Sequence, residues 1–288
     1  MNEMVAIPEQ AAAVSPDPQV GTARAAWAGA DWSWVRLRKI VLPLVVLALF
    51  LAGWEILTAS GRVSPLILAS PHAIFAAFFT SGGQIFGEGT ATLMEALTGF
   101  VVGNSAGLLI AILFIHSDLA RRTIFPIAIG AEAIPIVAVV PVLILWLGNG
   151  MEPKMFITSF LTFFPMLVNA FRGLRSADAE VNELLYTLSA TRWQKLLMVR
   201  LPASVPFLFA ALKLSACAVV VAAIVGEWLA SDRGLGHLIV LYGTQYKIPE
   251  VWATALVCTA MSLAVYGAVV VAERVATPWV SNSGTLSS

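Results

Sequence analysis

The chain has 288 residues, of which 59% are hydrophobic and only 12% are charged, and its formal net charge is zero. A soluble fold with a mean hydropathy of +0.85 would have too little polar surface, so the composition predicts an integral membrane protein. The balanced charge excludes the strongly basic surface that binds nucleic acid. The two cysteines, Cys217 and Cys258, lie inside apolar runs and indicate neither a disulfide framework nor a metal site.

Six stretches are long and apolar enough to cross a bilayer as helices, because a hydrocarbon core of about 30 Å requires roughly 20 apolar residues. They are Ile40–Leu57, Ala91–Ile115, Ile124–Leu147, Met155–Phe171, Val205–Val225 and Val251–Ala272. The predicted fold class is therefore all-α, a polytopic membrane protein with about six transmembrane helices. We expect a cytoplasmic N-terminal tail at residues 1–39, a transmembrane domain at 40–274 and a cytoplasmic C-terminal tail at 275–288.

The distribution of Lys and Arg predicts the orientation of these helices. With the N-terminus in the cytoplasm, 12 of the 17 basic residues lie inside, four lie outside and Lys213 lies within a span. Because basic residues accumulate in cytoplasmic loops, both termini are expected to be cytoplasmic. The external segment Thr58–Gly89 contains a half-length apolar stretch, Ile74–Phe79, that we expect to lie at the membrane interface.

The cytoplasmic segment 173–204 predicts two short helices. In the first, over 178–188, apolar residues recur at the helical spacing i, i+3, i+4 and i+7. The second is expected to begin at Thr191, because Thr191 and Gln194 have the spacing of a capping box. Pro202 and Pro206 are expected to end it and to introduce the next span.

This segment resembles the hallmark loop of binding-protein-dependent ABC importer permeases, which reads E-A-A, three residues, G, nine residues, I-x-L-P. Here Glu183-Leu184-Leu185 is followed after three residues by Ser189, and after nine more by Val199-Arg200-Leu201-Pro202. The spacing is intact, although Leu-Leu, Ser and Val replace the two alanines, the glycine and the isoleucine. The glycine position is expected to be a left-handed turn, which Ser tolerates less well.

The resemblance extends to Ala133-Ile134-Pro135, Gly226-Glu227-Trp228 and Gly234-Leu235-Gly236. It is similar to the branch that imports nitrate, sulfonates and taurine, and within it to members linked to thiamine pyrimidine precursors or riboflavin. It implies a bacterial cytoplasmic membrane protein in which two permease subunits, expected to be a homodimer, associate with two ATPase subunits and an extracytoplasmic binding protein. The implied cargo is a small heteroaromatic vitamin precursor, with nitrate, sulfonate or taurine as the alternative.

No G-x-x-x-x-G-K-[ST] phosphate-binding loop occurs in the sequence, so we expect no ATPase site, no catalytic residues and no cofactor in this chain. ATP and Mg are expected on the partner ATPase. An ion-coupled secondary transporter is a less favoured alternative, because no inverted repeat is detectable. A membrane-embedded metalloenzyme is disfavoured because His72, His116 and His237 show no paired ligand spacing.

The resemblance implies a set of ATPase-coupling residues, namely Glu183, Ser189, Ala190, Arg192, Trp193 and Pro202. Glu183 would pair with a basic ATPase residue or remain on a solvated helix face. Trp193 would be an anchor in the ATPase cleft or an interfacial aromatic residue. Arg192 is attributed to the inside-positive bias.

The candidate pathway residues are Glu132, Pro135, Pro141, Lys213 and Glu227. Ionisable residues within spans are functional candidates, and Glu132 either lines the pathway or has a hydrogen-bonded structural role. The prolines predict kinks, and kinked helices often line cavities. Lys213 is expected to extend to the cytoplasmic interface, and Glu227 to be exposed at the outer edge.

Overall fold

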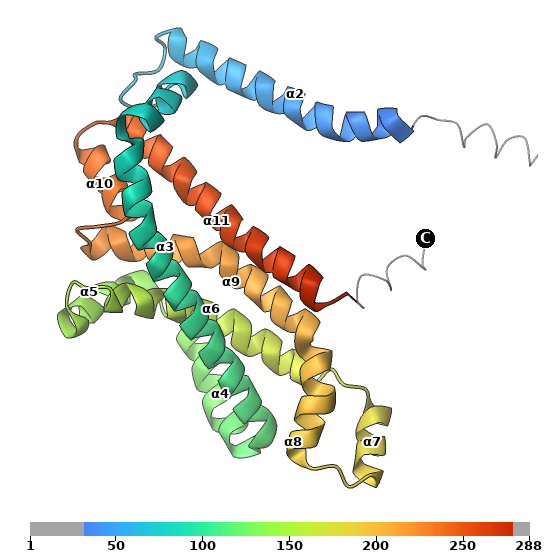
Figure 1. The fold of residues 1–288 in the computed structure, drawn as a ribbon. Coiled ribbons are helices and arrows are strands. Elements are labelled where there is room, and N and C mark those ends of the chain that lie inside the picture. Colours follow the sequence, from blue (N-terminus) through green and yellow to red (C-terminus); the bar gives the residue numbers. More distant parts are fainter. Residues whose placement is uncertain (1–31, 279–288) are drawn as a thin grey trace, which may run out of the picture. The chain divides into compact units, whose positions relative to one another are not determined.

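The computed structural model describes residues 32–278, so most of each predicted tail lies outside the described residues. The chain divides into two units, one ending at Ile56 and the other beginning at Leu57. All of the described secondary structure is helical (Figure 1).

The described part of the first unit is one helix, α2 (Trp32–Ala59), whose last residues belong to the second unit. Its segment Val41–Ala59 has a mean hydropathy of 2.2 and is long enough to cross a bilayer. This agrees with the first predicted span.

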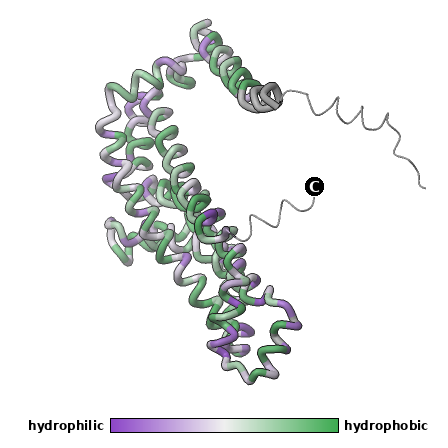
Figure 2. Tube along the Cα trace, turned by 45° about the vertical axis from the view of Figure 1, so that its right-hand side comes forward, coloured by the Kyte–Doolittle hydropathy of each residue, from purple (hydrophilic) through white to green (hydrophobic). Residues whose placement is uncertain are grey.

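The second unit is a bundle built around three long helices: α3 (Pro71–His116), α6 (Glu152–Leu174) and α9 (Leu201–Ala230). Helix α3 packs against α6 and α9, and α11 (Ile248–Ala276) packs along α9 and α3 (Figure 1). The short helix α10 (Leu235–Thr244) packs against α9, α11 and α3. Figure 2 shows hydrophobic residues along most of the length of these long helices, as a bilayer requires.

Three glycines spaced four residues apart bring α3 close to α6. Gly99, Gly103 and Gly107 lie on one face of α3, and a Cβ atom on any of them would overlap atoms of α6. The close approach allows the Thr162 hydroxyl of α6 to donate a hydrogen bond to the Gly99 carbonyl of α3, at 3.2 Å. Small residues at such contacts are typical of membrane helix pairs, because they let the backbones approach.

The third predicted span is broken into α4 (Asp118–Glu132) and α5 (Ile136–Leu147), which meet at an angle of 101°. Pro135 lies at the break, where its missing N–H and its ring prevent the helix from continuing. Pro126 and Pro141 lie inside α4 and α5, so only one of the three prolines breaks the helix.

Five helices in the described part of the chain are long and apolar enough to span a membrane, and the bent pair α4–α5 is a sixth if it is counted as one span. The predicted fold class is therefore confirmed. Ile74–Phe79, which the sequence places at the membrane interface, begins the 46-residue helix α3, and this helix is longer than a hydrocarbon core of about 30 Å requires.

Two ends of the bundle are used as reference points below. The α7 end carries His116, Ser117 and residues 175–191, including α7 (Ala179–Thr187). The α10 end carries the turns at residues 148–151 and 231–234. The charge distribution predicts that the α7 end is cytoplasmic.

Candidate functional site

The segment that resembles the importer loop forms a helical hairpin at the α7 end (Figure 1). Helix α7 ends at Thr187, and the turn that follows places Ser189 in the left-handed region, with φ of 52°. The turn is closed by a hydrogen bond from the Ala190 N–H to the Leu185 carbonyl, at 3.0 Å. The chain thus adopts the left-handed conformation expected at this position, although the residue is Ser instead of Gly.

The second helix of the hairpin, α8 (Arg192–Lys195), begins with the predicted capping box. The Gln194 N–H donates to the Thr191 hydroxyl at 3.3 Å, and the Thr191 N–H donates to Gln194 Oε1 at 2.8 Å. These bonds satisfy two of the free amide groups at the helix start. The prediction that the helix begins at Thr191 is confirmed.

Pro202 and Pro206 predicted that the second hairpin helix ends before the next span. This prediction is wrong, because α8 continues into the span. It continues through a π-helical turn, η1 (Leu196–Arg200), into α9, so that residues 192–229 form one helical rod. Pro202 lies in the first turn of α9, directly after the i→i+5 bonds of η1, where a missing N–H is tolerated. The helix that begins in the hairpin is therefore continuous with a membrane-spanning helix.

The hairpin presents apolar side chains outward. Leu184 on α7 is 58% exposed and Met198 on η1 is 70% exposed, and other large exposed side chains of the hairpin are Tyr186, Leu188, Trp193 and Leu197. Glu183 is exposed as well. Figure 2 shows hydrophilic residues interspersed with these apolar ones. Exposed apolar patches rimmed by polar residues are typical of protein interaction surfaces.

One side of α8 contacts the junction between α3 and α4. The Trp193 ring packs on the His116 ring with centroids 5.1 Å apart, and Arg192 Nη1 donates to the His116 carbonyl at 3.3 Å. Arg192 therefore makes a specific contact within the chain, which its attribution to the charge bias had not anticipated. Trp193 is still 63% exposed, so it can also contact a partner.

A buried ion pair lies at the α10 end. Lys154 Nζ on α6 donates to Glu95 Oε1 on α3 at 2.8 Å, and their side chains are 7% and 6% exposed. Lys154 also donates to the Ser231 hydroxyl at 2.7 Å. The pair joins residues 59 positions apart, whereas the charge distribution alone places Lys154 in an external loop. No local sequence signal connects the two residues.

Glu227 belongs to the same polar network. It is only 1% exposed, so the expectation of an exposed residue at the outer edge is wrong. Its carboxylate accepts from the Thr92 hydroxyl at 2.7 Å and from the Gly236 N–H at 2.6 Å. The turn between α9 and α10 folds back over Glu227, and this return of the chain is what buries it.

Side chains from α3 accept hydrogen bonds from two further amide groups at the start of α10. The Gly234 N–H donates to Glu88 Oε2 at 2.7 Å, and the Leu235 N–H donates to Thr92 Oγ1 at 2.8 Å. Glu88, Thr92 and Glu95 recur at helical spacing and so lie on one face of α3. Gly234 has φ of 99°, which explains the preference for glycine there. The turn at 231–236 is thus clamped onto α3.

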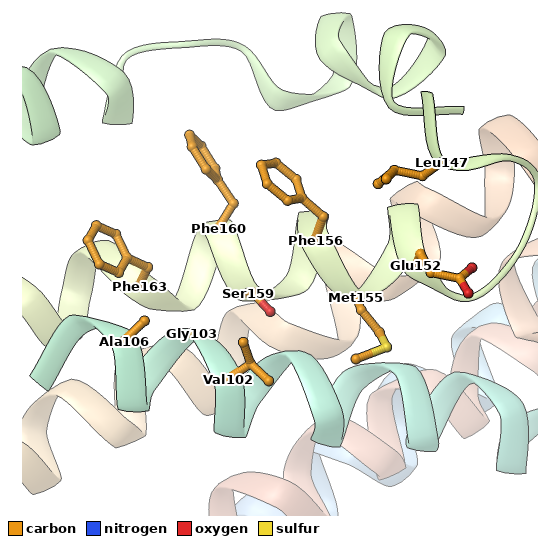
Figure 3. A pocket seen from close by; sticks show the side chains of 10 residues that line it. All are labelled: Val102, Gly103, Ala106, Leu147, Glu152, Met155, Phe156, Ser159, Phe160 and Phe163. Atoms are coloured by element: carbon orange, nitrogen blue, oxygen red, sulfur yellow. The ribbon is translucent and has the colours of Figure 1, made fainter. Parts of the chain in front are cut away.

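An apolar groove of 450 Å³ runs along α3 and α6 (Figure 3). Its wall on α6 is aromatic, with Phe156, Phe160 and Phe163, and Val102 and Ala106 come from α3. The Phe156 and Phe160 rings are nearly parallel, at an interplanar angle of 22°. None of these residues was among the predicted site residues.

Residues 103–281 match the family described as the binding-protein-dependent transport system inner membrane component. The match covers more than half of the chain. The chain belongs to this family. It is the permease subunit of an ABC transporter, a multi-pass inner membrane protein that works with a separate ATPase and a binding protein.

Curated relatives and a solved structure agree with this assignment. The permease is 29% identical over 82% of its length to the formylaminopyrimidine transport permease of Halalkalibacterium halodurans, covering 95% of that protein. It is 30% identical over 82% of its length to the riboflavin transport permease of Chloroflexus aurantiacus, covering 88% of it. Other relatives are named for aliphatic sulfonates and taurine. An amino acid ABC transporter crystal structure shares the fold, with a TM-score of 0.58 at 16% identity over 69% of this chain and 97% of that one.

The predicted pathway residues of the permease do not converge on one place. Glu132 and Pro135 are exposed at the α4–α5 break, and Pro141 is exposed on α5. Lys213, which was expected to extend to the cytoplasmic interface, forms an ion pair within the bundle. Its ammonium group donates to both carboxylate oxygens of Glu273 on α11, each at 2.9 Å. Lys213 and Glu227 are 14 residues apart on α9, about 21 Å along the helix.

Proposed function

We propose that this permease imports a small heteroaromatic molecule of the pyrimidine or flavin class, delivered by an extracytoplasmic binding protein. The main support is the similarity, over 82% of the chain, to relatives named for formylaminopyrimidine and riboflavin. The groove phenylalanines on α6 add support, since flat aromatic rings stack favourably on one another.

The charges of the span helices also favour an organic cargo over nitrate. Passage of a small anion requires cationic or hydrogen-bond donors along its route. Lys154 and Lys213, the lysines of α6 and α9, are each paired with a glutamate. These two cations are therefore already neutralised by the protein's own carboxylates.

Uptake by the reconstituted transporter tests this proposal. The permease, its ATPase and its binding protein are placed in proteoliposomes, and the entry of labelled formylaminopyrimidine, riboflavin, taurine and nitrate is measured with and without ATP. ATP-dependent uptake of either heteroaromatic compound is the expected result. Uptake of nitrate or taurine alone would contradict it and would favour the second candidate cargo class, which the relatives named for sulfonates and taurine support.

The proposed coupling element is the hairpin formed by α7 and α8. It would seat in a cleft of the ATPase, which would hold ATP and Mg, through Glu183, Ser189, Ala190, Arg192 and Trp193. The exposed apolar side chains of the hairpin support this role. The continuity of α8 with α9 through Pro202 supports it too, because closure of the ATPase would then tilt a span directly.

The proposed assembly contains two copies of the permease and two ATPase subunits. A bundle with six spans needs a partner to enclose a path, and a homodimer with two-fold symmetry is the simplest arrangement. The break in α4–α5, with Glu132, Pro135 and Pro141, and the spans containing Lys213 and Glu227 would line or border this path. Both termini and the α7 end would be cytoplasmic.

A double substitution tests the coupling role. Glu183→Lys reverses an exposed charge on α7, and Trp193→Ala removes an aromatic ring that is 63% exposed and also packs on His116. Membrane insertion should be unaffected, because it depends on the apolar spans. We expect less ATPase to copurify and its hydrolysis to become less dependent on the binding protein. Glu180→Lys on the same helix is the matched charge control, and wild-type behaviour of the double variant would disprove the coupling role.

A further inference from the structure

His116, the last residue of α3, is held in a fixed orientation by its own helix. Its Nδ1 lies 2.9 Å from the Ile112 carbonyl, to which it donates a hydrogen bond. The next residue, Ser117, ends α3 and begins α4, where its hydroxyl accepts from the Ala120 N–H at 3.2 Å. The imidazole therefore projects from a defined corner between α3 and the broken span.

This corner contacts α8 through two separate groups. The His116 ring packs against the Trp193 ring, and the His116 carbonyl accepts from Arg192. These residues are 76 and 77 positions away in the sequence, so the contact is purely tertiary. Leu196, one turn further along, is 2% exposed and packs in the cluster that contains Phe114 of α3. The side of α8 toward α3 is therefore held by the bundle, and the remaining surface of the hairpin is exposed.

Two routes thus connect α8 to the membrane. The first is covalent and leads through η1 into α9. The second is a contact that leads through His116 to the start of α4, and from there to the 101° break at Pro135. A rigid contact between two helices transmits a shift of one to the other, because packed interfaces deform little.

We propose that His116 is a positioning residue that makes α3 and α4 follow α8 when the partner ATPase moves it. The inference rests on the proposed coupling role of the hairpin and adds a second connection, from α8 through His116 to α4. Without the His116 contact, α9 would still respond to the ATPase, and the response of α4 would be weaker, because only the packing of Leu196 and α9 would still reach it. His116 itself need not touch the ATPase.

Hydrogen exchange in the assembled transporter distinguishes the two routes. The complex of permease and ATPase in nanodiscs is compared without nucleotide and after trapping with ATP and vanadate, a probe that needs no cargo. In the wild type, exchange at residues 118–135 and at residues 196–206 should differ between the two states. In His116→Ala, the difference at 118–135 should become smaller while the difference at 196–206 remains, and ATPase attachment and basal hydrolysis should be unchanged. His116→Phe, which keeps a flat ring, should restore the response, and His237→Ala on α10 is the matched control.

A covalent link gives a test that does not depend on the alanine variant. With Cys217→Ser and Cys258→Ala as background, His116→Cys with Trp193→Cys should weaken the response at 118–135, and a short bifunctional thiol reagent joining the two cysteines should restore it. A full response in His116→Ala, or no rescue by either the ring or the link, would overturn the proposal. Loss of ATPase attachment in His116→Ala would also overturn it. Wild-type behaviour of the Glu183→Lys, Trp193→Ala variant would instead disprove the coupling role itself.

Discussion

Lys154 of α6 and Glu95 of α3 form an ion pair, 2.8 Å between Nζ and Oε1, that is almost completely shielded from solvent. The interaction connects the start of α6 to the middle of α3, and the Ser231 hydroxyl extends it to the end of α9. Three helices therefore meet at one ammonium group. Removing one partner of such a pair leaves an uncompensated charge in a medium of low dielectric constant.

Substitution of one partner of the ion pair should therefore lower the stability of the fold more than substitution of both partners. Lys154→Met alone should lower the free energy of unfolding by about 3 to 5 kcal/mol, whereas Lys154→Met with Glu95→Leu should recover much of the loss. Thermal unfolding of the detergent-solubilised permease measures both effects. Lys247→Met, at an exposed lysine, is the control and should change little. A single variant as stable as the wild type would show that the pair is not formed.

The close glycine contact between α3 and α6 predicts that the effect of a glycine-to-alanine substitution on stability depends strongly on where the glycine lies. Gly103→Ala would place a Cβ against the Ser159 carbonyl and the Thr162 hydroxyl, so it should destabilise the bundle by about 1 to 3 kcal/mol through overpacking. A Cβ atom added at Gly267 on α11 would meet no other atom within 4 Å. Gly267→Ala should therefore be neutral or stabilising, because alanine favours a helix. Equal effects of the two substitutions on the unfolding temperature would argue against the close α3–α6 approach.

Glu227 should protect the start of α10 from solvent exchange. Its carboxylate accepts from the Gly236 N–H and the Thr92 hydroxyl, so Glu227→Ala would leave two buried donors without a partner, at about 1 to 3 kcal/mol each. We expect faster hydrogen exchange of the amides at residues 234–236. Thr92→Val should expose mainly the Leu235 amide, because that amide donates to the Thr92 hydroxyl. Unchanged exchange in both variants would contradict the clamp.

Replacement of Ser189 with glycine should stabilise the turn between α7 and α8. A non-glycine residue in the left-handed conformation costs roughly 1 kcal/mol, so Ser189→Gly should slow hydrogen exchange of the Ala190 amide that closes the turn. Ser189→Val, with a branched side chain, should speed it. Ser176→Gly, next to the hairpin, serves as the control for added backbone freedom. Faster exchange in Ser189→Gly would show that serine makes a favourable contact there.

The orientation in the membrane is open to a labelling test. Single cysteines at Gly150 and Asp232, both exposed at the α10 end, should react with a membrane-impermeant thiol reagent in intact cells. A cysteine at Ser176, exposed at the α7 end, should react only after the membrane is opened. The background requires replacement of Cys217, which is exposed. Reaction of Ser176→Cys in intact cells would reverse the proposed topology.

The sequence by itself determined those features whose causes are local. Apolar length is a property of a single segment, so it predicted the membrane class and the spans. The capping box at Thr191 and the left-handed turn at Ser189 arise within a few residues, and both could be predicted for the same reason. The spacing from Glu183 to Pro202 carried the family resemblance, which the match over residues 103–281 confirmed.

The tertiary structure decided which residues meet, because that depends on how helices far apart in the sequence pack. The distribution of basic residues places Lys154 in an external loop, yet the folded bundle buries it against Glu95. Glu227 lies at the end of a span, yet the return of the chain at Gly234 covers it. His116 has no sequence neighbour that would indicate a partner, and only the approach of α8 to the α3–α4 corner brings it against Trp193. Local patterns specify the helices, whereas these contacts follow from close packing of side chains in three dimensions.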